Sequence, residues 1–218
     1  MPGDERVRAP QQVVSSERAG EEPRGDQDHG PRPNGALPAG EIPLAGRAYR
    51  RAGSRISAVE DGPVERALEL WRLGTARLLS GSLAEAVECF TRSLAAHPTA
   101  EAYTFRGWAY SFEGRLDDAI EECRRAIAVD PAFGNPYNDI GCYLLQQGRP
   151  DEAVSWFEKA KTAARYEPRH YPYLNLGRLR AARGELAEAV AEFEGALAEN
   201  PGDPIATKYL EALRFQVN

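Results

Sequence analysis

The chain has 218 residues, of which 42% are hydrophobic and 28% charged, a composition ordinary for a soluble protein with a packed core. Its formal net charge is −6 and its isoelectric point is about 5.3. These values argue against a general nucleic-acid binder, because such a protein needs a basic surface. No run of about 18 apolar residues occurs, so we expect no membrane insertion.

The three cysteines, Cys89, Cys123 and Cys142, form no close pair. A disulfide framework or a zinc site would need paired spacing, so we expect reduced thiols. The N-terminus carries Asp4 and Glu5 and no apolar run, which argues against a secretory signal. We therefore expect a cytoplasmic protein.

Residues 1–62 differ from the rest because proline and glycine interrupt them throughout and Tyr49 is their only aromatic residue. Such a segment buries too little apolar area to offset its ordering entropy, so we predict a disordered tail. Residues 1–60 hold nine arginines and nine acidic residues, so they do not form a basic arm for DNA.

From Pro63 onward the apolar spacing becomes helical. A first helix is predicted to end near Gly81, and a second to start at Ser82, where Ser82 and Glu85 match a capping box. Pro98 closes this first unit, because proline cannot continue a helix.

The same pattern of two helices and a turn recurs along the chain. The predicted units cover about 67–99, 100–133, 134–169 and 170–203, followed by a capping helix at about 204–216. Asp203 is the expected N-cap of that helix, and Ile205, Tyr209 and Leu213 its apolar stripe. The third unit has two extra residues, which predict a longer second helix or a looser turn.

Small residues recur at fixed places in the four units. A glycine inside a helix costs about 1 kcal/mol relative to alanine, so its repetition predicts a close approach of two helices. A phenylalanine fills the space between hairpins, except that Cys123 replaces it in the second unit. The recurring residues are Gly74, Gly107, Gly141 and Gly177 in the first helices, and Ala86, Ala119, Ala153 and Ala189 with Phe90, Phe157 and Phe193 in the second.

These residues resemble the tetratricopeptide repeat (TPR) family, whose 34-residue motif runs from an aromatic residue through Leu-Gly, Ala and Phe to a closing proline. Tyr103, Gly107, Tyr110, Ala119, Ala126 and Pro131 match it, whereas the third unit lacks the closing proline. The resemblance implies an all-α fold, a right-handed α-solenoid of antiparallel helix hairpins over residues 63–218.

In this family the first helices line a concave groove that binds a segment of another protein. The resemblance therefore implies a non-catalytic adaptor that binds a peptide or helix. The predicted groove is aromatic in its first half and polar, with one cation, in its second. Its residues are Trp71, Thr75, Thr104, Phe105, Trp108, Phe112, Asn138, Tyr171, Leu174, Asn175 and Arg178.

Several alternatives stay open at this point. Trp71, Trp108 and Phe112 could simply pack between helices, and the array could self-associate as a homo-oligomeric scaffold. The carboxylate clamp of some family members is not expected, because the corresponding positions hold no cation. Scattered histidines predict no metal site, and without a nucleophile paired to a base we expect no enzyme and no cofactor.

Overall fold

The computed structural model describes residues 62–217, with side chains to Leu213, and the predicted tail lies outside these residues except for Gly62. Within this range the chain is all-α, which confirms the predicted fold class. None of the helices in the described range is long and apolar enough to cross a membrane.

Within residues 62–217, eight helices form four consecutive hairpins, and a ninth follows them. The first helices of the hairpins are α2 (Pro63–Leu79), α4 (Ala100–Phe112), α6 (Asn135–Gln146) and α8 (His170–Ala182). The second helices are α3 (Leu83–Ala96), α5 (Leu116–Val129), α7 (Pro150–Thr162) and α9 (Leu186–Glu199), and the last helix is α10 (Pro204–Val217).

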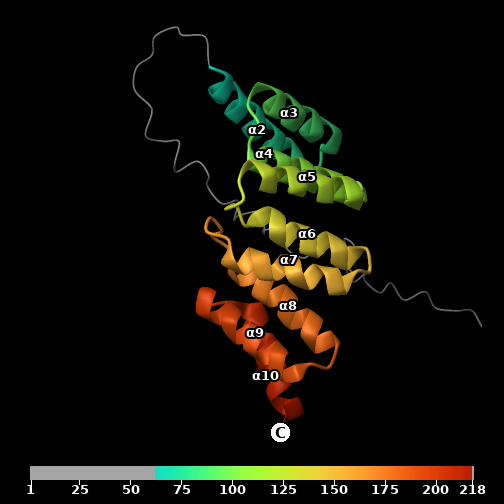
Figure 1. The fold of residues 1–218 in the computed structure, drawn as a ribbon, viewed down its shortest axis with the longest axis vertical. Helices are drawn as coiled ribbons and strands as arrows, with labels where there is room; N and C mark the ends of the chain where they lie inside the picture. The colour runs from blue at the N-terminus through green and yellow to red at the C-terminus, as the bar shows by residue number, and fades with distance from the viewer. Residues whose placement is uncertain (1–61, 218) are drawn as a thin grey trace, which may run out of the picture. The chain divides into compact units, whose positions relative to one another are not determined.

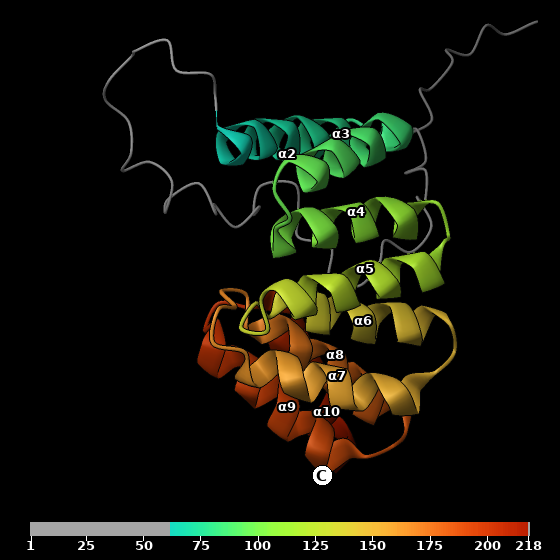
Figure 2. The same ribbon diagram turned by 45° about the horizontal axis from the view of Figure 1, so that its top comes forward.

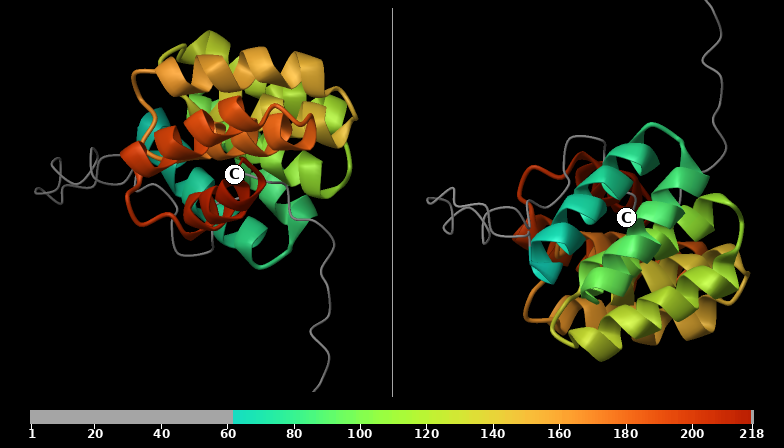
Figure 3. Two further views of the ribbon diagram at one scale, coloured as in Figure 1. Left: turned by 90° about the horizontal axis from the view of Figure 1, so that it is seen from below. Right: turned by 90° about the horizontal axis from the view of Figure 1, so that it is seen from above.

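The hairpins stack in chain order, with α2 and α3 at one end and α10 at the other (Figures 1–3). Each first helix packs against its own second helix and also contacts the first helix of the next hairpin. No comparable contact joins second helices to one another in residues 62–217. The first helices are therefore the more closely spaced layer, as on the inner side of a curved stack.

The turn within each hairpin requires a glycine with positive φ, between +72° and +80°. In the first of these turns, the predicted capping box at Ser82 is wrong. The Ser82 side chain makes no cap hydrogen bond and instead accepts one from Ser80 Oγ at 3.3 Å. Glu85, the other half of the expected box, pairs with Arg77 at 3.1 Å.

The helical glycines sit where a phenylalanine ring of the partner helix crosses them. A Cβ added to Gly141 would lie 2.5 Å from Phe157 Cε1, and one at Gly74 would lie 2.7 Å from Phe90 Cε1. Both phenylalanines are fully buried. The expected close approach of the two helices is confirmed, and the ring is what requires the glycine.

The second hairpin has no ring at this crossing because Cys123 replaces the phenylalanine. A Cβ on Gly107 would meet Ala119 O at 3.1 Å and Cys123 Sγ only at 3.7 Å. Tyr143, from the next hairpin, is 1% exposed and belongs to the same buried cluster as Cys123. A large side chain from α6 thus helps to fill the volume that a phenylalanine occupies in the other hairpins.

The two extra residues of the third unit form a turn, since α7 ends at Thr162. Arg165 stands where the other units have their closing proline, and its N–H donates to Ala132 O at 2.8 Å. In return, Gly134 N donates to Arg165 O at 3.0 Å, which makes a short parallel bridge between residues 133 and 165. A proline at position 165 has no N–H and could not form it.

The last helix covers the apolar end of the fourth hairpin. Asp203 caps it as predicted, with Oδ1 accepting from Ile205 N at 2.9 Å and from Ala206 N at 2.8 Å. The expected apolar stripe packs on the fourth hairpin, with Leu213 buried and Ile205 and Tyr209 half-buried against the same cluster. The buried side chains of this helix are Ala206, Leu210 and Leu213.

Candidate functional site

The eleven residues predicted to line the groove all lie on the first helices α2, α4, α6 and α8. The structure divides them by exposure. Phe112 is exposed, and Trp71, Trp108, Tyr171 and Arg178 are half-buried. The other six are buried, namely Thr75, Thr104, Phe105, Asn138, Leu174 and Asn175.

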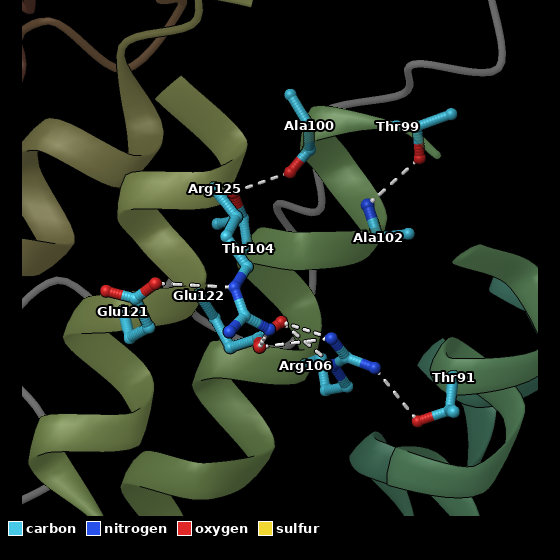
Figure 4. Close-up of polar contacts among 9 residues, drawn as sticks. All are labelled: Thr91, Thr99, Ala100, Ala102, Thr104, Arg106, Glu121, Glu122 and Arg125. Atoms are coloured by element: carbon cyan, nitrogen blue, oxygen red, sulfur yellow. Dashed lines mark hydrogen bonds and ion pairs between the residues drawn. The ribbon is translucent and has the colours of Figure 1, made fainter. Parts of the chain in front are cut away.

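The two buried threonines bond to their own helices. Thr75 Oγ1 donates to Trp71 O at 2.9 Å, and Thr104 Oγ1 donates to Ala100 O at 2.8 Å (Figure 4). A hydroxyl that bonds to the carbonyl four residues earlier satisfies its donor within the helix. Both hydroxyls are therefore bonded within their own helices, α2 and α4.

Four aromatic side chains of α2 and α4 form the aromatic end of the site. The Phe105 ring lies 5.2 Å from the Trp71 ring, nearly edge-on at 78°, and 5.1 Å from the Trp108 ring. Phe112, one turn beyond Trp108, is 46% exposed. Together these residues, Trp71, Phe105, Trp108 and Phe112, are the aromatic cluster of the inner layer.

A buried carboxylate joins the aromatic cluster to the next hairpin. Trp108 Nε1 on α4 donates to Asp139 Oδ2 on α6 at 2.7 Å. Asp139 is 5% exposed. Burial raises the pKa of this carboxyl to about 7, although the hydrogen bonds from Trp108 and Asn138 oppose the rise. The group therefore changes its charge near neutral pH.

Beyond Asp139 the inner layer becomes polar. Asn175 Nδ2 on α8 donates to Asn138 Oδ1 on α6 at 3.1 Å and lies 3.4 Å from Cys142 Sγ. Burial raises the pKa of the Cys142 thiol well above its usual range, so it stays protonated. The two asparagines are buried and bond to each other, so they link α6 to α8.

The far end of the site carries one cation and one tyrosine from the predicted set. The Arg178 guanidinium lies 5.8 Å from the centre of the Tyr209 ring on α10. The Tyr171 ring lies 4.2 Å from that of His170. The predicted polar half therefore also holds an aromatic side chain, Tyr171, and a buried apolar one, Leu174.

An ion-pair network fixes the helix that carries Trp108. The Arg106 guanidinium donates to both oxygens of Glu122 on α5 and to Thr91 Oγ1 on α3, and Arg125 adds a second cation to Glu122 (Figure 4). The Arg106 and Glu122 side chains are 12% and 5% exposed. This network links three helices behind the aromatic cluster.

Two hollows accompany these helices. A small apolar one, of about 50 Å³, includes Leu68, Trp71 and Glu101 in its lining, and lies next to the aromatic cluster. A wider one, of about 320 Å³, lies between α5, α6 and α7 and has Ile120 and Trp156 in its wall. Within residues 62–217, no group of three or more His, Cys, Asp or Glu side chains could hold a metal ion.

The residues predicted to line the groove do not include Asp139. The spacing along a helix predicts which side of the helix a residue faces. It does not predict which residue of a neighbouring helix that side chain contacts. The available signal was a carboxylate on one first helix, 31 residues after a tryptophan on the preceding one, which puts it three residues before the position that corresponds to the tryptophan.

Comparison with known proteins identifies the repeats. The family model described as tetratricopeptide repeat matches residues 71–136 and 139–204. The small glutamine-rich tetratricopeptide repeat-containing protein 2 of Mycosarcoma maydis is 29% identical over 100 residues, which cover 45% of this chain and 28% of that protein. Sperm-associated antigen 1 of Mus musculus is 43% identical over 86 residues, 39% of this chain and 10% of that protein.

A solved structure of pilF from Pseudomonas aeruginosa superposes with a TM-score of 0.65 at 25% identity, covering 71% of this chain and 70% of that one. The match to the curated relatives is much less complete along their length. This chain spans under a third of the Mycosarcoma maydis protein and a tenth of the mouse antigen.

Proposed function

Because the chain belongs to the tetratricopeptide repeat family, we propose that it is a non-catalytic adaptor whose inner layer binds a segment of another protein. Repeats of this family typically mediate protein–protein interactions. The proposal places the protein in the cytoplasm, with a peptide or a helix of its partner lying across α2, α4, α6 and α8. It includes neither a nucleic-acid partner nor a cofactor.

One observation carries the proposal, the partial exposure of the aromatic cluster on the closely spaced first helices. Trp71 and Trp108 are half-buried and Phe112 is 46% exposed. The buried Phe105 ring contacts both tryptophan rings. Rigid aromatic side chains that are partly buried lose little entropy on binding, and tryptophan is enriched among residues that dominate binding energy.

The buried positions argue against a clamp for a terminal carboxylate. Phe105, Asn138 and Cys142, at places where such a clamp needs polar or cationic groups, are all buried. The Thr75 hydroxyl already donates to a carbonyl of its own helix. A ligand gripped mainly through its apolar side chains fits this face better than one gripped through its carboxylate.

The test is affinity capture from native lysate with the full chain and with Trp108→Ala. If Trp108 is an anchor, binding of a genuine partner should weaken by about 2 kcal/mol, or roughly 30-fold. Trp156→Ala is the matched control, since Trp156 lies on the second helix α7 against Tyr137, with 6.2 Å between ring centres. Equal loss in both variants, or none in either, would reject the aromatic cluster as the binding face.

A self-associating scaffold is the second candidate, and apolar exposure on α2 favours it. Val64, Leu73 and Leu79 on this end helix are 39%, 45% and 57% exposed. Light scattering over a range of concentrations distinguishes the two functions. If the wild type is a dimer and Leu73→Glu is a monomer, the scaffold is supported. A wild type that stays monomeric at high concentration would exclude it.

A further inference from the structure

The inner layer contains a carboxylate that no cation of the described chain neutralises. Within residues 62–217, Glu122 pairs with Arg106 and Arg125, and Glu101 pairs with Arg165. Asp139 differs, because its interactions there are hydrogen bonds from neutral groups, the Trp108 indole and the Asn138 amide.

We infer that the partner segment carries a lysine or arginine side chain that lies against the Trp108 indole beside Asp139. This inference rests on the proposed function and names the chemistry of its ligand. Trp108 is half-buried, with Phe105 against one part of it and the Asp139 carboxylate at its N–H edge.

The geometry favours a cation for two reasons that act together. The face of an indole ring attracts a positive charge, most strongly when the site is shielded from water. A carboxylate 2.7 Å from the indole nitrogen adds a negative charge at the same place. Because the carboxylate is buried, its field is screened less by salt than that of a surface acid.

Three arginines among residues 62–217 that lie on the first helices or bond to them contact other groups. Arg106 on α4 bonds to Glu122, Arg165 in the turn after α7 bonds to Asp130 and Glu101, and Arg178 on α8 lies near the Tyr209 ring. The wider charge balance agrees, since residues 61–218 contain 18 basic and 24 acidic side chains. A basic segment is thus the complementary ligand, and an acidic one would be repelled.

The other titratable groups around Asp139 keep their protons near pH 7. They are Cys123 on α5, Cys142 and Tyr143 on α6, and Tyr166 in the turn before α8, and burial raises the pKa of each well above its usual range. Of these groups Asp139 therefore changes its charge near neutral pH, beside the Arg178 guanidinium on α8, which acts on Cys142, and a cationic ligand should bind more tightly as pH rises through that region.

The experiment is a selection of short random peptides on the immobilised full chain at about pH 8, where Asp139 is ionised. Wild type should enrich peptides with a lysine or arginine near an apolar residue. Asp139→Asn keeps an oxygen that can accept from Trp108, so the fold is preserved while the charge is lost, and this preference should disappear. Asp151→Asn removes an equal charge from a 92% exposed side chain on α7 and should behave as wild type.

A second measurement uses the best wild-type peptide and its analogue with norleucine in place of the basic residue. Wild type should bind the basic peptide about tenfold more tightly, and Asp139→Asn less than about twofold more tightly. For wild type, the difference should shrink at about pH 6, where Asp139 is mostly protonated.

The outcomes separate this inference from the proposed function. Selected peptides that lose affinity in Trp108→Ala but contain no basic preference would overturn only the cationic subsite. Enrichment of basic residues that persists in Asp139→Asn would do the same. Peptides that ignore Trp108→Ala, or no enriched peptide at all, would reject the binding face itself and the cationic subsite with it.

Discussion

The Glu122 carboxylate accepts from Arg106 Nε at 2.8 Å and from Arg106 Nη2 at 3.0 Å, and both side chains are nearly buried. Removing one partner of such a pair leaves an uncompensated buried charge. We therefore expect Glu122→Ala to lower the free energy of unfolding by about 3 kcal/mol. Urea denaturation followed by circular dichroism measures this.

The control for that prediction is Glu85→Ala. Glu85 pairs with Arg77 at 3.1 Å, but both side chains are about half exposed, at 59% and 46%. Exposed pairs contribute about 0–1 kcal/mol, so this variant should stay close to wild type. If both variants lose a similar free energy of unfolding, burial of the Arg106–Glu122 pair does not increase its contribution to stability.

The buried Asp139 should make the stability depend on pH. The pKa of its carboxyl is about 7 in the folded protein and 3.8 as the ordinary value, so unfolding releases a proton between these pH values. Stability should therefore fall as pH rises from about 4 to about 7 and then level off, by at most about 4 kcal/mol. Thermal denaturation of wild type and Asp139→Asn across this range checks it.

The difference between those two proteins isolates Asp139 from the other groups. Asp130, whose pKa is lowered by its hydrogen bonds to Arg165 and to backbone N–H groups, contributes an opposite trend at low pH in both proteins. Asp139→Asn should gain stability relative to wild type as pH rises. A constant difference across the range would contradict the buried, titrating carboxyl.

Gly141→Ala should be strongly destabilising, because the new Cβ would lie 2.5 Å from a buried phenylalanine ring. Overpacking of this kind costs about 1–3 kcal/mol. Gly107→Ala should cost less, since the nearest atom to its new Cβ is Ala119 O at 3.1 Å and Cys123 Sγ lies 3.7 Å away. Gly202→Ala, with no atom within 4 Å, is the control. Chemical denaturation of all three variants should give this order, and an equal loss at positions 107 and 141 would contradict it.

Two helix starts that look alike in sequence should respond differently to alanine. Asp203 accepts from two backbone N–H groups of α10, so Asp203→Ala should cost about 1–2 kcal/mol and loosen that helix. Ser82 makes no cap bond, and Ser82→Ala should be nearly neutral. Hydrogen exchange of residues 205–207 locates the effect, and unchanged exchange in Asp203→Ala would count against it.

The fold could be predicted because its evidence is local and repeated. A glycine at the same place in four units, with a small residue on the partner helix, predicts a close crossing of two helices. This prediction does not depend on residues elsewhere in the chain. The spacing also predicted which residues of each first helix share a side. It could not give depth, because the burial of Asn138 and Asn175 depends on how closely α6 and α8 approach.

The same limit applies to the residues that act in pairs. The capping box at Ser82 was a valid local pattern, but Glu85 reaches Arg77 on the preceding helix instead. The missing proline at position 165 was visible in the sequence, yet its partner, Ala132, lies 33 residues earlier and carries no signal of its own. Contacts between residues of different units depend on how the helices pack in three dimensions. The spacing of residues in one sequence does not give that packing.

The backbone bridge between residues 133 and 165 bears on how such an array can change in evolution. Units that contact their neighbours only through side chains can be duplicated or deleted one at a time. Here Arg165 N–H needs the carbonyl of Ala132, which belongs to the preceding unit. The second and third units are therefore tied as a pair, and a recombination that separates them would leave Ala132 O and Arg165 N–H without each other, while the bond from Gly134 N to Arg165 O lies within the third unit.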